Sequence, residues 1–238
     1  MTDLHTHILP GMDDGARTAE ESLALLRMER EQGVNTVVLT PHLYRDRENP
    51  AHFLHRRERA MGELERALDG LSPQEREAMP RLLLGAEVTW CPNLADLDGL
   101  DKLCIGNTQN LLLELPSVPW NARMIDGIYD LISRTGITPV IAHLERYLKY
   151  QSSQMLGEVL VLGVPVQVTG DALTRFSTRR AALDLLDGRG DRLIASDCHR
   201  KDTRPPVMRA AMDTANKKLG ERRTAALLRC ADELAGVV

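Results

Sequence analysis

The chain has little of several features that would each point to a class of function. Only 3% of its 238 residues are aromatic, so its core must be built from aliphatic side chains and methionine. No apolar run reaches the roughly 18 residues that a membrane-spanning helix needs, and no apolar leader precedes Asp3, so we expect neither membrane insertion nor export. The formal net charge of −4 offers no basic surface for a nucleic acid.

The cysteines also lack a pattern. Cys91, Cys104, Cys198 and Cys230 are scattered and form no Cys-x-x-Cys pair. Without an export signal, we expect them to be reduced thiols of a cytoplasmic protein.

Short apolar runs alternate with amphipathic stretches along the whole chain. The sequence predicts seven strands, near residues 3–7, 34–39, 82–88, 111–115, 138–142, 164–169 and 193–195. It predicts helices near residues 18–32, 45–66, from 72, 122–135, 154–162, 179–186 and from about 206 onward. Most strands begin about thirty residues apart, as in strand–helix–strand units, which favours parallel pairing. We therefore expect an α/β barrel, with residues 1–238 as a single domain and no linker.

Ionisable side chains recur where these strands end. His5 and His7 are two residues apart on a strand, so they share one face. In an α/β barrel the carboxyl ends of different strands converge on one site. The candidate metal ligands are His5, His7, Asp14, His42, Glu87, Glu114, His143, Asp197 and His199. Imidazoles with carboxylates suit zinc, manganese or iron, and nine candidates are too many for one ion, which indicates two or three.

Taken singly, these residues also have ordinary structural explanations. A lone histidine at a strand end is more often a hydrogen-bonded core residue, and Glu87 could pair with a lysine. Asp14 precedes Gly15 in a pattern typical of turns, and for Asp14 and Glu114 alone the structural explanation is favoured. Burying the whole set without a metal would be costly, so the set as a whole favours a metal centre. We expect His52 and His55 to face solvent without a role.

Two arginines follow candidate ligands closely. Arg146 lies three residues after His143, and Arg204 lies five after His199. Guanidinium groups bind phosphate bidentately, so both are candidates for holding a phosphoryl group. The alternative, that they are ordinary surface arginines, carries about equal weight on the sequence alone.

The motifs together resemble a known family. They are DLHTHILPGMDDG (3–15), TPHL (40–43), GAEV (85–88), LLELP (112–116), TPVIAHLERY (138–147) and ASDCHRKDTRPP (195–206). This set is similar to the PHP (polymerase and histidinol phosphatase) superfamily. It is most similar to the bacterial capsule-type, manganese-dependent protein-tyrosine phosphatases, and the resemblance covers most of the chain.

The resemblance implies a distorted (β/α)7, TIM-like barrel, the PHP fold, with a site for three ions. These are usually Mn²⁺, with iron or zinc as alternatives. By motif, His5 and His7 would hold a first metal, Glu87 would bridge it to a second, and Asp197 would complete the first site. The other ions would be held by Asp14, His42, Glu114, His143 and His199. Arg146 and Arg204 match the family's phosphate-binding arginines, and the segment 166–169 offers no ligand.

The resemblance also implies a substrate and a mechanism. A bridging water made acidic by two metals would attack the phosphorus of a phosphotyrosine protein, expected to be the tail of a bacterial tyrosine kinase of capsule or exopolysaccharide synthesis. An oligomer is compatible with the sequence. Three alternatives stay open: a histidinol-phosphate type small-molecule phosphatase, a non-catalytic metal-binding module and an amidohydrolase. The last lacks a candidate carboxylated lysine here.

Overall fold

The computed structural model describes residues 1–237 and contains short strands that pair only in parallel. In chain order the strands are β1 (Thr2–Thr6), β2 (Thr36–Leu39), β3 (His42–Leu43), β4 (Arg81–Leu84), β5 (Glu87–Thr89), β6 (Asn110–Glu114), β7 (Thr138–Ile141), β8 (Val166–Thr169) and β9 (Arg192–Ala195). Parallel neighbours need long crossover connections, and helices provide them.

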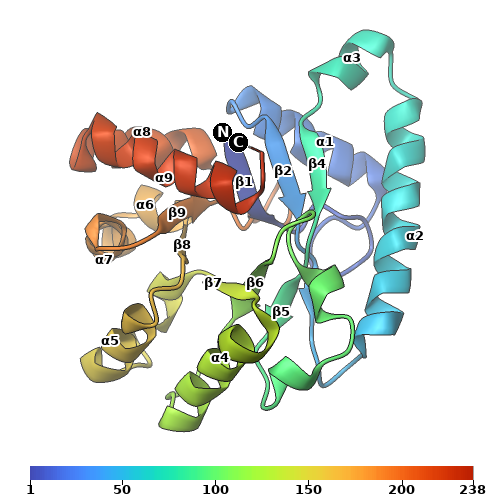
Figure 1. Cartoon of the computed structure of the whole chain (residues 1–238). Helices are drawn as coiled ribbons and strands as arrows, with labels where there is room; N and C mark the ends of the chain where they lie inside the picture. Colours follow the sequence, from blue (N-terminus) through green and yellow to red (C-terminus); the bar gives the residue numbers. More distant parts are fainter. Residues whose placement is uncertain (238) are drawn as a thin grey trace.

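The α-helices are α1 (Ala19–Glu31), α2 (Pro50–Asp69), α3 (Pro73–Ala78), α4 (Ala122–Thr135), α5 (Ser153–Val161), α6 (Gly170–Thr174), α7 (Phe176–Asp187), α8 (Met208–Leu219) and α9 (Glu221–Leu234). Three short 3₁₀ helices are η1 (Leu94–Asp96), η2 (Leu100–Leu103) and η3 (Leu144–Tyr147). In Figure 1 these helices surround the strands.

The strands close into a barrel of seven extended segments, as the sequence predicts. Two sheets have the orders β1-β2-β4 and β3-β5-β6-β7-β8-β9. The pairs β2 with β3 and β4 with β5 each belong to one segment, interrupted at residues 40–41 and 85–86. The ring closes where the amide of Asp197 donates to the carbonyl of His5 (2.8 Å) and that of His7 donates to the carbonyl of Cys198 (2.8 Å).

The two interruptions lie side by side and distort the barrel. Pro41 has no amide hydrogen for a ladder, and Gly85 lies so close to Thr40 that a Cβ would be 3.2 Å from its methyl group. Pairing continues across the break, since Gly85 donates to the Leu39 carbonyl (2.9 Å) and Glu87 to the Pro41 carbonyl (3.1 Å). Beyond the break, His42 and Glu87 are directly paired.

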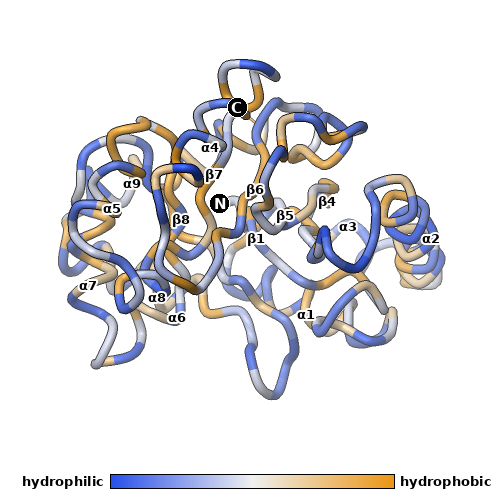
Figure 2. Tube along the Cα trace, turned by 90° about the horizontal axis from the view of Figure 1, so that it is seen from below, coloured by the Kyte–Doolittle hydropathy of each residue, from blue (hydrophilic) through white to orange (hydrophobic). Residues whose placement is uncertain are grey.

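The core has two parts. Inside the barrel, one buried cluster joins residues from the strands, such as Leu112 and Leu193, to Ala231 and Leu234 of α9. Helix α9 contacts β1 and β9, so it covers one end of the barrel. A larger cluster fills the space between strands and outer helices. In Figure 2 the labelled strands lie centrally with helices on all sides. Burial on both faces explains the uncharged strand sequences.

Several boundaries differ from the sequence prediction. The C-terminal helix is two helices, because Gly220 adopts φ 83° between α8 and α9. Helix α2 begins at Pro50 rather than at residue 45, with Asn49 as its cap, and α7 begins at Phe176 rather than at 179. Helix α4 ends at Thr135, as predicted, and Gly136 caps it with φ 71°. Within residues 1–237, no helix has the length and apolarity to cross a bilayer.

Candidate metal centre

The nine predicted ligand side chains lie together at the carboxyl end of the barrel. Two of the nine, the buried carboxylates Glu87 and Asp197, each lie close to several of the others. Each histidine of the set has a ring nitrogen within 4 Å of a carboxylate oxygen of another member, and each carboxylate has an oxygen within 4 Å of such a nitrogen. Two arginines, Arg146 and Arg204, join the group through Asp197.

Glu87 is the centre of the cluster. Its Oε2 lies 3.2 Å from the Nε2 of His5, 3.2 Å from the Nε2 of His7 and 2.9 Å from the Nδ1 of His42. The same oxygen is buried and accepts no hydrogen bond. Its other oxygen, Oε1, lies 2.8 Å from the Nε2 of His143. A buried carboxylate that faces four imidazoles could therefore be shared between neighbouring groups of ligand atoms.

Residues behind the first two histidines fix their orientation. The Nδ1 of His5 lies 3.2 Å from the Oε1 of Gln167, and the Nδ1 of His7 lies 2.7 Å from the Oδ2 of Asp13. With a proton on each Nδ1, the Nε2 lone pairs of both rings point at Glu87 and Asp197. Such outer hydrogen bonds set the tautomer of metal-binding histidines.

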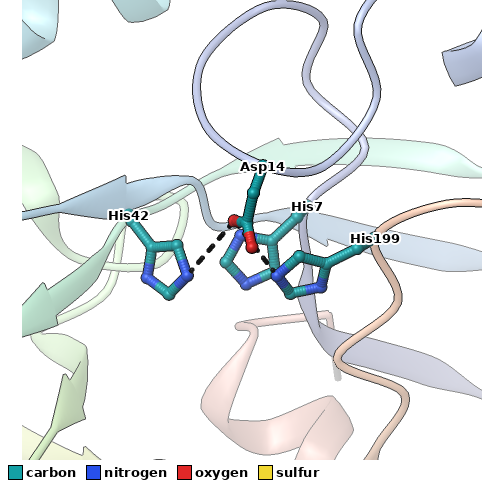
Figure 3. A group of neighbouring side chains, drawn as sticks. All are labelled: His7, Asp14, His42 and His199. Carbon is teal, nitrogen blue, oxygen red and sulfur yellow. Dashed lines mark ion pairs between the residues drawn. The ribbon is translucent and has the colours of Figure 1, made fainter. Parts of the chain in front are cut away.

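A second group lies on the loop side of His7. Figure 3 shows Asp14 above the rings of His7, His42 and His199. The Oδ1 of Asp14 is 3.4 Å from the Nε2 of His199 and 3.7 Å from that of His42. The Nδ1 of His199 lies 3.0 Å from the Asp197 carbonyl oxygen, so its Nε2 also faces inward. Asp14 is thus both a loop residue and a member of the cluster.

Glu114 is the most peripheral candidate. Its Oε1 lies 3.8 Å from the Nε2 of His143, and its Oε2 accepts a hydrogen bond from Thr89 (3.1 Å). His42, Glu87 and Glu114 together offer three ligand atoms close enough for one ion. So do His5 with His7 and Glu87, and the four residues in Figure 3 offer four such atoms.

Burial and neighbouring charges shift the pKa values of several residues of the cluster. Burial opposes ionisation of Glu87, but His5 and His42 outweigh it and hold the pKa of Glu87 well below its ordinary value. Burial likewise opposes ionisation of Asp197, yet His5, His7 and both arginines keep its pKa well below the usual range. Against the cost of burial, Asp13 raises the pKa of His7 well above normal. Glu87 and Asp197 are therefore ionised carboxylates that attract positive charge, whereas burial and the charge of Glu87 raise the pKa of Glu114.

The backbone is also unusual at this site. His143 (φ 33°) and Asp197 (φ 53°) are two of three non-glycine residues with positive φ among those described. Such conformations are uncommon for residues with a Cβ and concentrate at functional sites. Gly15 lets the loop carrying Asp13 and Asp14 fold onto His7, since a Cβ there would lie 2.0 Å from the His7 carbonyl oxygen.

Arg146 and Arg204 converge on a single oxygen. Each places an Nη2 in contact with the Oδ2 of Asp197. Arg204 also places its Nη1 3.3 Å from the Nε2 of His199. Both guanidinium groups keep about a third of their side-chain surface exposed, 38% for Arg146 and 32% for Arg204. They stand between the cluster and solvent, where an incoming anion would meet them.

Sequence reasoning missed Asp13 and Gln167. Asp13 holds both the His7 ring and the backbone amide of His42 (2.9 Å). Gln167 accepts from the amide of His143 (2.6 Å) as well as meeting His5. The available signals were the doubled acid before Gly15 and one amide in an otherwise uncharged strand. Residues 166–169 supply no ligand to the cluster, but they do orient two.

Several other histidine, cysteine and aromatic residues lie outside the cluster. His52 and His55 are exposed on α2, as predicted. All four cysteines are free, and Cys198 is buried with its thiol directed at Glu29 rather than at the candidate ligands. Trp120 is a packing residue against Tyr147. Glu87 pairs with imidazoles and not with a lysine.

The cluster fits bound metal ions on its own chemistry. Glu87 Oε2 and His143 Nδ1 are buried polar atoms without a hydrogen-bond partner, and such atoms are costly in a folded protein. Nitrogen and oxygen donors in overlapping groups of three or four suit manganese, iron or zinc better than calcium or magnesium.

Comparison with known proteins gives consistent results. Residues 1–233 match the family described as capsular polysaccharide synthesis, CpsB/CapC. The chain is 31% identical to tyrosine-protein phosphatase CpsB of Streptococcus pneumoniae, over 94% of this chain and 93% of that one. It is 30% identical to tyrosine-protein phosphatase YwqE of Bacillus subtilis, over 92% and 85%.

A solved structure also resembles the whole fold. It belongs to a study of YwqE from Bacillus subtilis and CpsB from Streptococcus pneumoniae, described as unique metal-dependent tyrosine phosphatases. The TM-score is 0.81 at 25% identity, and the match covers 100% of this chain and 95% of the other.

Proposed function

Because the chain belongs to the CpsB/CapC family of capsular polysaccharide synthesis, we propose that it is a metal-dependent protein-tyrosine phosphatase. The reaction is hydrolysis of a phosphate monoester. One observation carries the proposal: a buried, ionised carboxylate, Glu87, faces four imidazoles beside two arginines that share one carboxylate oxygen. Cation-binding and phosphate-binding groups thus adjoin each other.

The nine clustered side chains would hold the ions. His5, His7 and Asp197 would contribute to one site, and Glu87, which is close to both groups, would be shared with a second site that includes His42 and Glu114. His143 would add to the second set, and Asp14 with His199 would serve a third ion. Bound divalent ions supply Lewis acidity and lower the pKa of water toward neutrality.

The arginines would bind the phosphoryl group. A phosphate that displaces the Oδ2 contact of Asp197 can accept hydrogen bonds from Arg146 and Arg204 together, since both guanidinium groups already point to one place. These groups would stabilise the charge on the equatorial oxygens during in-line displacement. The leaving tyrosine phenolate has a parent pKa of about 10, so little help from a general acid is needed.

We propose four finer properties. Manganese is the resident metal, with iron or zinc as the alternatives. The substrate is the phosphorylated tail of a bacterial tyrosine kinase of capsule or exopolysaccharide synthesis; the family description supports the link to capsule synthesis, and the names of the relatives support phosphotyrosine as the target. The protein acts in the cytoplasm, and residues 1–238 form one phosphoesterase domain.

Metal analysis combined with hydrolysis assays tests the proposal. Purified protein should contain two or three ions per chain and should release phosphate from phosphotyrosine peptides. Chelation should abolish this activity, and added Mn²⁺ should restore it. His5→Ala and Asp197→Ala should lose turnover while circular dichroism shows a folded chain. Activity that survives complete metal removal would refute the proposal. Turnover of small phosphate monoesters alone would favour the histidinol-phosphate type.

A further inference from the structure

A cleft next to the metal centre has no role in the chemistry above. Its volume is about 480 Å³, within the range of roughly 300–1,000 Å³ that is typical of ligand pockets. One wall is the end of η3 with the turn that follows it, including Leu148 and Tyr150. The other wall is formed by α6 and the start of α7, including Ala172. Arg146 lines this cleft and also contacts Asp197, so the cleft is continuous with the candidate phosphate site.

Exposed apolar residues occur in the lining of this cleft and next to lining residues in the sequence. Among residues 1–237, five large hydrophobic residues have exposed side chains, and three of them line the cleft or adjoin a lining residue in sequence: Val118 (57%), Tyr150 (37%) and Phe176 (93%). Tyr150 is part of the lining, Val118 follows the lining residue Ser117, and Phe176 lies between Arg175 and Ser177, which both line the cleft. In a chain with only 3% aromatic residues, this grouping marks an interaction surface.

The border also carries positive charge. Lys149 is exposed and makes no ion pair within the described part of the chain, and its ammonium lies 4.7 Å from the centre of the Tyr150 ring. Arg175 is paired with Asp171 of α6 (2.6 Å) on the exposed rim. Lys149 is therefore available for an acidic group, and the ring beside it is available for an apolar one.

We propose that this cleft binds the polypeptide next to the phosphotyrosine, and that it favours apolar or aromatic residues accompanied by acidic ones. The inference rests on the proposed phosphatase function and deepens it. A phosphate held by Arg146 brings the adjoining chain to the mouth of the cleft. There an apolar side chain would cover Tyr150 and Phe176, and a carboxylate would pair with Lys149. A small phosphate ester is too short to reach these residues, so the cleft selects proteins.

Paired peptides and surface variants test this role. Two phosphotyrosine peptides of equal length are compared on the manganese-loaded protein, one with aromatic and acidic neighbours and one with alanines. We expect kcat/KM to be about tenfold higher for the first, the size of one substantial binding contact. Lys149→Glu and Phe176→Asp should each remove most of this advantage through KM, with kcat unchanged. Hydrolysis of p-nitrophenyl phosphate should stay at the parent rate.

Val161→Asp is the matched control. Val161 is also an exposed apolar residue (86%), but it lies at the end of α5, and neither it nor its sequence neighbours line the cleft. Its variant should retain the peptide preference. Equal kcat/KM for both peptides, or an equal loss in Val161→Asp and Phe176→Asp, would overturn the proposal. Hydrolysis without any flank preference would refute only the cleft, whereas failure to hydrolyse every phosphotyrosine substrate would refute the phosphatase function itself.

Discussion

The Nε2 atoms of His5 and His7 lie 3.1 Å apart, although the other nitrogen of each ring is already engaged. Gln167 meets the Nδ1 of His5, and Asp13 meets that of His7. Two imidazole lone pairs at this separation need a positive charge between or beside them, either a proton or a metal ion. Because Glu87 and Asp197 face the same two atoms, a cation is strongly favoured there.

Asp13→Ala should weaken metal binding although Asp13 is outside the predicted ligand set. Loss of the acceptor frees the His7 ring to rotate and to change tautomer. Outer-shell changes of this kind typically cost about 10–100-fold in affinity. Calorimetric titration of the chelated protein with Mn²⁺ measures the effect. Asp13→Asn is the control, because its amide oxygen can still accept from Nδ1, and it should lose less. Parent-like affinity in Asp13→Ala would contradict the orienting role.

Arg204→Ala should reduce turnover without removing metal. Arg204 touches Asp197 through Oδ2, whereas the Oδ1 of that carboxylate faces His5 and His7. Loss of one preorganised hydrogen-bond donor to the charge that develops in the transition state typically lowers the rate about 10²–10³-fold. Arg204→Lys should recover only part of it, since an ammonium cannot bind two phosphate oxygens in the planar fashion of a guanidinium. Elemental analysis checks the metal content, and an unchanged rate with phosphotyrosine peptide would count against phosphate binding.

Cys198→Ala should be nearly silent, although Cys198 lies between two candidate ligands in sequence. Its side chain is fully buried, and burial together with Glu29 raises the pKa of the thiol well above its ordinary value. A nucleophilic cysteine needs the opposite shift and access to substrate. We expect kcat within about twofold of the parent, as for changes outside the chemistry, and no inactivation by iodoacetamide. Rapid inactivation at Cys198 would reveal a thiol mechanism.

Much of the barrel could be predicted because its signals are local. The spacing of His5, in β1, and His7, directly after it, predicts that both side chains leave on one side regardless of the rest of the chain. Gly136 ends α4 through its own left-handed conformation, and Ser72 with Glu75 forms the capping box that starts α3. The residues at strand ends then follow from the topology, because parallel strands in a barrel bring their carboxyl ends together.

The rest depends on contacts that local patterns do not encode. Gln167 meets His5 across 162 positions of sequence, and this contact exists only because the ring closes between β9 and β1. The strand breaks at residues 40–41 and 85–86 lie side by side on neighbouring segments, so each depends on the conformation of the other. The spacing of Thr18 and Glu21 is typical of a capping box, and Thr18 does cap α1, but the Glu21 carboxylate accepts from the amide of Arg17 and does not complete the box. Where the local sequence allows several hydrogen-bond partners equally well, tertiary packing decides which of these contacts forms.

Behind the metal centre, two acidic residues share a fully buried site. Asp3 accepts hydrogen bonds from the amides of Ser196 (2.9 Å) and His5 (3.3 Å). Glu29 of α1 accepts from the hydroxyl of Ser196 (3.4 Å) and the thiol of Cys198 (3.5 Å). Burial first, and then the charge of Asp3, raise the pKa of Glu29 well above its ordinary value of 4.5. The folded chain therefore keeps a proton on Glu29.

Glu29→Gln should stabilise the protein above pH 5 and leave it unchanged near pH 4. The unfolded chain loses the Glu29 proton near the ordinary pKa, whereas the folded chain keeps it to higher pH. The folded state therefore binds more protons between these two values, and stability falls as pH rises through that window. Glutamine mimics the protonated acid without this penalty. Each ~1 kcal/mol of this penalty that is removed should raise Tm by about 2–4 °C in a chain of this size.

Melting curves at pH 4 to 8 with chelator present measure the difference in Tm between Glu29→Gln and the parent. Glu31→Gln, at an exposed position on the same helix, is the control. Because the histidines are the same in all three proteins, their contribution to the pH dependence cancels when the Tm values are subtracted. Parallel curves for parent and Glu29→Gln across the whole range would show that Glu29 is ionised in the fold.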